Sequence, residues 1–96
     1  MEPRFKIAAT VPDAQASVHT MHCSAQALQA DHPVITSGRF ELRCVPGAGF
    51  EAHLELCLPQ RQVLVNGAAL TAEAAVDRAV AAAARELTRL EQPRGS

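Results

Sequence analysis

The segment 74–90, which reads AAVDRAVAAAARELTRL, constrains the fold of this chain more than any other segment. An α-helix turns by about 100° per residue, and on that geometry the larger apolar side chains fall within an arc of about 80°. A stripe of this kind is typical of a helix that packs on a hydrophobic core. The many alanines favour the helix and keep it slim enough to lie close to a sheet. The stripe consists of Val76, Val80, Ala83, Leu87 and Leu90.

Both ends of this helix carry recognisable signals. Thr71 is the predicted N-cap, because its hydroxyl can accept a hydrogen bond from a free backbone N–H. Glu73 near the start and Arg89 near the end both complement the helix dipole. Pro93 stops the helix shortly afterwards. We therefore predict a helix over 71–91.

Alternating apolar and polar residues predict strands in the rest of the chain. Pro12 and Asp13 open a first helix, and Pro33 ends it because the residue before a proline is pushed out of the helical region. The Asn66–Gly67 pair is expected to end the last strand. The predicted elements are strands over about 4–9, 35–45, 50–58 and 61–66, and helices over about 13–31 and 71–91.

The second and third strands are expected to form an antiparallel hairpin around the turn sequence Pro46–Gly49. Phe40, Leu42 and Cys44 would face the core from the first of these strands. A register that pairs Cys44 with Phe50 places charges of opposite sign, or a histidine and a carboxylate, across from each other, and each such pair stabilises the sheet by a few tenths of a kcal/mol. The outward pairs are Arg43 with Glu51, Glu41 with His53, and Arg39 with Glu55.

The element order β-α-β-β-β-α predicts an α+β fold. Each helix has one apolar stripe and each long strand has one apolar face, so the economical arrangement packs two helices on one face of a four-stranded sheet. At 96 residues the whole chain, 1–96, is expected to be a single domain. The other face of the sheet would be mostly polar and open to water.

Composition narrows the classes of function. The net charge of −1 gives no general attraction to nucleic acid or to anionic membrane. The three cysteines show no metal-type spacing, and no signal sequence or apolar span is apparent. We therefore expect a cytoplasmic protein with reduced thiols, no cofactor, no small-molecule substrate and no membrane partner.

Two segments resemble one known family. Ala74–Asp77 followed by Ala84–Arg89 resembles the final helix of the ribosome hibernation-promoting factors, also described as sigma-54 modulation or ribosomal subunit interface proteins. Val63–Gly67 and the hairpin before it sit where that family places its sheet. The resemblance covers nearly the whole chain in element order, and it is close residue by residue only in the last helix.

The resemblance implies a small, non-enzymatic, stress-related protein of the single-domain short form. Members bind the small ribosomal subunit in the channel used by messenger and transfer RNA. Arg78, Arg85 and Arg89, which lie within about 40° of one another opposite the apolar stripe, are then the predicted contacts to the rRNA backbone. No Lys or Arg occurs between Lys6 and Arg39, so we expect binding that is weak, confined to a narrow patch, or lost.

A second basic set is predicted on the open face of the sheet. It contains Arg39, Arg43 and Arg61, with Arg4 and Lys6 beside them. Because glutamates alternate with these cations, a salt-bridged neutral face is the competing interpretation. The alternative function is accordingly a protein–protein interaction domain of the same fold that has lost RNA binding and uses this face, with at most a weak homodimer.

Two further clusters combine side chains of metal-binding or nucleophilic types. His19, His22 and Cys23 on the first helix contain metal-ligand side chains, but Cys23 is expected to point away from the histidines and no second ligand pair follows at a useful spacing. On the third strand a cysteine and a histidine could form a nucleophilic pair, but residues two and four apart are neighbours on any strand face. That cluster is Cys57, His53 and Glu55, and we expect neither a metal site nor an enzyme.

Overall fold

The structure is a computed structural model that describes residues 5–12 and 14–91. The predictions for Arg4, Asp13 and Pro93 concern positions outside these residues. The elements follow the predicted order β-α-β-β-β-α. They are β1 (Phe5–Thr10), α1 (Ala14–Asp31), β2 (Ser37–Val45), β3 (Gly49–Cys57), β4 (Gln62–Ala69) and α2 (Ala72–Glu91).

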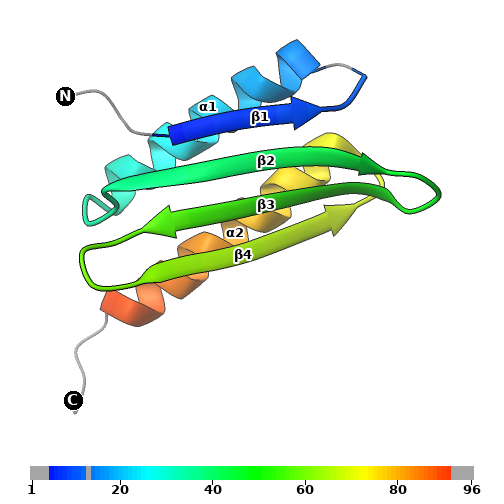
Figure 1. Ribbon diagram of the computed structural model, residues 1–96. Coiled ribbons are helices and arrows are strands. Elements are labelled where there is room, and N and C mark those ends of the chain that lie inside the picture. The colour runs from blue at the N-terminus through cyan, green and yellow to red at the C-terminus, as the bar shows by residue number, and fades with distance from the viewer. Residues whose placement is uncertain (1–4, 13, 92–96) are drawn as a thin grey trace.

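The four strands form one sheet in the order β1-β2-β3-β4, with both helices behind it (Figure 1). β1 and β2 run parallel, and the other neighbours run antiparallel. A parallel pair needs a long crossover connection, which α1 supplies between β1 and β2. The predicted α+β fold, with two helices on one face of a four-stranded sheet, is confirmed. Neither helix in the described part of the chain is long and apolar enough to cross a membrane.

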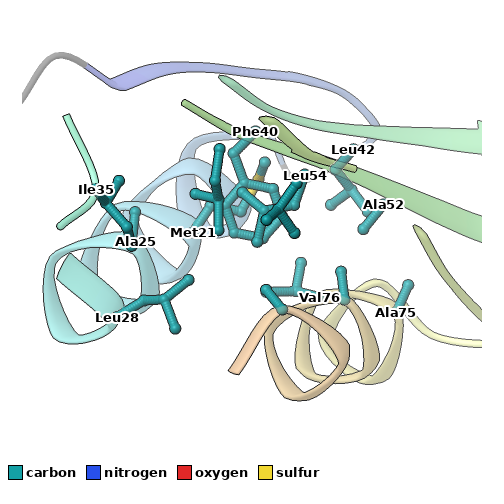
Figure 2. Close-up of a cluster of buried hydrophobic side chains, with 14 of the residues drawn as sticks. Met21, Ala25, Leu28, Ile35, Phe40, Leu42, Ala52, Leu54, Ala75 and Val76 are labelled. Atoms are coloured by element: carbon teal, nitrogen blue, oxygen red, sulfur yellow. The ribbon is translucent and has the colours of Figure 1, made fainter. Parts of the chain in front are cut away.

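The core lies between the sheet and the helix layer (Figure 2). Phe40 on β2 and Leu54 on β3 point from the sheet toward the helices. Met21 on α1 and Val76 on α2 meet them from the other side, and all four side chains are fully buried. With few aromatic residues available, this core is filled mainly by aliphatic side chains, as the sequence predicts.

The predicted register of the β2–β3 hairpin is confirmed. Cys44 pairs with Phe50, and the turn between the strands is closed by the N–H of Ala48, which donates to the carbonyl of Val45 over 2.9 Å. Gly47 and Gly49 adopt positive φ angles of 78° and 102° in this turn. Arg43 faces Glu51, Glu41 faces His53, and Arg39 faces Glu55.

The predicted end of the last strand at Asn66–Gly67 is wrong. β4 continues to Ala69, and Gly67 pairs with Ala52 inside the sheet. Gly67 is buried because α2 lies directly on it. A Cβ there would overlap the carbonyl oxygen of Ala75 and would come within 2.5 Å of the backbone nitrogen of Ala79. This glycine permits a close helix–sheet approach and does not form a turn.

Other boundaries move by one or two residues. β2 begins at Ser37 and not at residue 35, because the N–H of Ile35 bonds the carbonyl of His32 and Ile35 is buried before the strand starts. β1 runs to Thr10, and β3 begins at Gly49 and ends at Cys57. Cys44 shares the helix side of the sheet with Phe40 and Leu42, as predicted, but it is exposed and does not join the core. The helices do not reach far enough to cover that end of β2.

Candidate nucleic-acid interface

The three arginines of α2 form an exposed row along the helix. At 1.5 Å per residue, the row from Arg78 to Arg89 spans about 16 Å. The sequence predicts this row directly opposite the core, but the structure places it closer to the buried face. Ala75 and Ala79 are fully buried whereas Val80 is only half-buried, so the buried face is turned by about 30° toward the arginines. The contact of these alanines with Gly67 explains this rotation.

Arg78 is held against the sheet as a result. Its Nη1 donates to the carbonyl oxygen of Ala68 in the edge strand β4, over 3.1 Å. This bond uses one of the five N–H donors of the guanidinium and holds the side chain against β4, so the remaining donors meet a phosphate only in the orientation that the bond sets. Arg78 therefore contributes to the positive charge of the row but is not free to reorient.

Arg89 is paired within the helix. Its Nε donates to Oε1 of Glu86 over 3.4 Å, and its Nη2 bonds the other carboxylate oxygen. The hydrogen bond from Arg89 lowers the pKa of Glu86, and the same bond raises the pKa of Arg89. Both groups stay charged near neutral pH, so the pair is neutral as a unit. Reasoning from the sequence missed Glu86, although its spacing of three residues from Arg89 is a usable signal.

Arg85 lies between these two and differs from both. It is exposed, and it makes no hydrogen bond or ion pair with any residue in the ranges 5–12 and 14–91. Its guanidinium is therefore available to a phosphate without loss of an internal contact. Arg85 is the strongest anion-binding candidate among the predicted site residues.

Arg61 does not lie on the open face of the sheet, although the sequence predicts it there. It lies in the connection between β3 and β4 and lines a hollow of about 260 Å³ together with Leu90 of α2. The positive charge of Arg61 helps to lower the pKa of Glu86, which lies on α2. Alternation explains the position, because Gln62 faces outward and the preceding residue turns to the helix side.

The open face carries the remaining arginines of the second set. Arg43 donates to Oε1 of Glu51 from Nε at 3.0 Å and from Nη2 at 2.7 Å. His53 Nε2 lies 2.9 Å from the same oxygen. The bond from Arg43, and secondly that from His53, lowers the pKa of Glu51. Arg39 faces Glu55 in the register without an ion pair in the part of the chain described here.

A shallow hollow of about 330 Å³ lies over this face, lined by both signs of charge. Each arginine on it has a glutamate directly opposite on the next strand. The salt-bridged interpretation therefore fits this face better than a basic surface does, and exposed pairs of this kind add little stability.

The outer face of α1 carries no Lys or Arg. One expectation there is wrong: Cys23 does not point away from the histidines, because its Sγ lies 3.8 Å from Nε2 of His19 one helical turn earlier. No group of three or more potential metal ligands occurs among the residues that the structure describes. On β3, His53 bonds Glu51, whereas Cys57 accepts from Gln62 Nε2 at 3.8 Å, so the cysteine and the histidine do not form a nucleophilic pair.

Comparison with known proteins places the fold. No family model and no curated protein matches the sequence. Among solved structures, the N-terminal domain of protein Y from Thermus thermophilus superposes with a TM-score of 0.77 at 19% identity, covering 94% of this chain and 100% of that one. A ribosomal subunit interface protein from Coxiella burnetii superposes with a TM-score of 0.80 at 10% identity, covering 92% and 97%. The chain has the fold of these proteins, and the fold that the sequence resemblance implied is confirmed.

Proposed function

We propose that this chain is a divergent factor of the ribosome hibernation type that binds the small ribosomal subunit through its rRNA backbone in the cytoplasm. The observation that carries the proposal is the agreement of two independent signs. The last helix resembles this family in sequence, and the complete fold superposes on two proteins named as protein Y and as a ribosomal subunit interface protein. The proposed activity is binding and not catalysis.

In this proposal Arg85 is the principal phosphate contact. Arg78 and Arg89 flank it. Arg78 can offer the donors that its bond to Ala68 leaves unused, whereas Arg89 contributes fully only if it exchanges Glu86 for phosphate oxygens. The pair that Arg89 would give up is itself charge-assisted, so we expect Arg89 to contribute less than Arg85. Arg39, Arg43 and Arg61 form a second set of proposed contacts, which the glutamates near them weaken.

Co-sedimentation with ribosomes at low and moderate salt tests the proposal. We expect the wild-type chain in the small-subunit and whole-ribosome fractions at low salt, with less bound at moderate salt because the contacts are to phosphates. Arg85→Glu should weaken binding about tenfold or more, and the Arg85→Glu/Arg89→Glu variant should bind less still.

Lys6→Glu is the matched control. It makes the same change of charge on the open face, away from α2 and beside the second set of contacts, which the glutamates weaken, and it should therefore weaken binding clearly less than Arg85→Glu does. Absence of the wild-type chain from ribosomal fractions at both salt concentrations would refute the proposal. An equal loss in the Lys6 and Arg85 variants would show that net charge matters and that the arginine row does not.

The second candidate function is a protein–protein interaction domain of the same fold without RNA affinity. The observation that favours it is the internal pairing of Arg78 and Arg89, which leaves one free arginine on the described part of α2. This candidate predicts no salt-dependent association with ribosomes and no effect of the Arg85 substitution.

A further inference from the structure

The open face of the sheet carries charges in a regular pattern. On β2 the outward residues are Arg39, Glu41 and Arg43, whose signs alternate plus, minus, plus. The outward residues facing them on β3 are Glu55, His53 and Glu51, where two carboxylates flank a histidine. The two central columns of the face are therefore complementary to each other.

This pattern determines which symmetric pairing of two copies is favourable. A two-fold axis parallel to the strands, between β2 and β3, lays β2 of one copy over β3 of the other without shifting residues along the strand. Each arginine then meets a glutamate of the second copy. A two-fold axis across the strands would instead bring Arg39 over Arg43, which is repulsive.

We propose that the open face pairs with a second copy of this chain, around a two-fold axis parallel to the strands. Arg43 and Glu51 of each copy then form an alternating ring of four charges, and Arg39 and Glu55 form a second ring. Charge networks of this kind contribute more than isolated exposed pairs. The proposal concerns the face opposite α2 and does not depend on ribosome binding.

The outer strands fit the same arrangement. Lys6 on β1 and Leu64 on β4 lie at the same height along the strands. Lys6 pairs with Arg39, which pairs with Glu55, and Glu55 pairs with Leu64. Reversal of the strand order places Lys6 over Leu64 of the second copy. Leu64 is 69% exposed, and the aliphatic stem of a lysine can cover it.

Sheet geometry allows these contacts and limits their strength. Packed sheets lie about 10 Å apart, and their strand directions differ by about 30°. This rotation shifts a charge pair that lies about 7 Å from the centre of the interface by roughly 3–4 Å. Arginine and glutamate side chains span such a shift. Four strands about 4.8 Å apart and about 23 Å long offer roughly 450 Å² per copy, or about 900 Å² in total, which lies below the range of stable specific interfaces and within that of weak, transient ones. The pairing should therefore be weak and sensitive to salt.

Charge reversal of Arg39 and Glu55 tests the proposal by analytical ultracentrifugation of the protein alone, at concentrations up to about 1 mM in low salt. The wild type should show a monomer–dimer equilibrium. Arg39→Glu and Glu55→Arg should each raise the dimer dissociation constant about tenfold or more, because both copies then oppose like charges. An equimolar mixture of the two variants restores both contacts, so its dissociation constant should return to within about threefold of wild type.

The double variant Arg39→Glu/Glu55→Arg keeps opposite charges within each chain and across the pair, so it should also dimerise. Matched controls are Arg85→Glu and Glu73→Arg on α2, which make the same charge changes away from the face. Each should dimerise as wild type does, and their mixture should show no gain. Circular dichroism confirms folding of every variant.

A wild-type chain that stays monomeric throughout, a dimer that Arg39→Glu leaves intact, or a mixture that fails to recover would each overturn the proposal. Equal losses in the α2 controls would overturn it as well, because they would show an effect of net charge alone. A monomer would leave this face to solvent or to another partner.

Discussion

Gly67 sets the distance between α2 and the sheet at the scale of single residues. It sits inside β4, paired with Ala52, and the backbone of Ala75 and Ala79 rests where its side chain would be. Because those neighbours are backbone atoms of a helix, they cannot move aside one at a time. The same contact turns the arginine row toward β4 and brings Arg78 within reach of Ala68.

Gly67→Ala should therefore reduce the free energy of unfolding by about 3 kcal/mol, since the helix must lift from the sheet. Urea denaturation followed by circular dichroism measures the change. Gly47→Ala is the control. Gly47 has a positive φ of 78°, but a Cβ at this position would meet no other atom within 4 Å, so the substitution should cost only about 1 kcal/mol of backbone strain. Equal losses in the two variants would contradict the close-approach argument.

Glu51 is the second residue with a specific prediction. Its pKa is lowered by the bond from Arg43 and then by that from His53, so the contacts stabilise the fold above the ordinary glutamate range and lose effect as the pH falls through the lowered pKa. Arg43→Gln should raise the pKa of Glu51 toward its ordinary value, as measured by NMR titration of the carboxyl carbon. The pKa of Glu86, which Arg89 lowers, should stay the same in that variant.

At the scale of elements, α2 combines a local start signal with a tertiary role. Thr71 is the N-cap that the sequence predicts: its Oγ1 accepts from the N–H of Ala74 over 3.2 Å, and its carbonyl accepts from Ala75 over 3.1 Å. α2 contacts β2, β3 and β4 as well as α1, so its formation is coupled to the whole core. Any loss at the cap should appear in global stability.

Thr71→Ala should lower the free energy of unfolding by about 1 kcal/mol, because a backbone N–H in the first turn loses its partner. Thermal or urea denaturation gives the value. Thr71→Ser keeps the hydroxyl and should stay close to wild type. A serine variant as unstable as the alanine variant would show that the methyl group, and not the cap, matters.

At the scale of the whole molecule, the charges fall on two sides with different arrangements. The helix side carries the arginine row of α2, and α1 beside it has no cation of the Lys or Arg type. The open side carries paired charges of both signs. A molecule with a net charge of −1 built in this way depends on local patches for any association with a polyanion.

This distribution gives the ribosome proposal a quantitative form. The logarithm of the binding constant should fall with the logarithm of salt concentration with a slope of about 0.7 in magnitude if Arg85 alone meets a phosphate, and of about 2 if all three arginines do. Filter binding or co-sedimentation across a salt series measures the slope. A slope that Arg85→Glu leaves unchanged would exclude this residue as a phosphate contact.

The sequence by itself determined the element order, the hairpin register and the cap of α2. These follow from periodicity, turn residues and charges that are neighbours along or across one element, and such interactions are local. Only the tertiary structure decided that Gly67 lies inside a strand, that Arg78 bonds Ala68, and that Arg61 lies on the helix side. Each depends on how far a helix rotates and how closely it approaches the sheet. That geometry comes from packing between residues distant in sequence, which periodicity along one element does not encode.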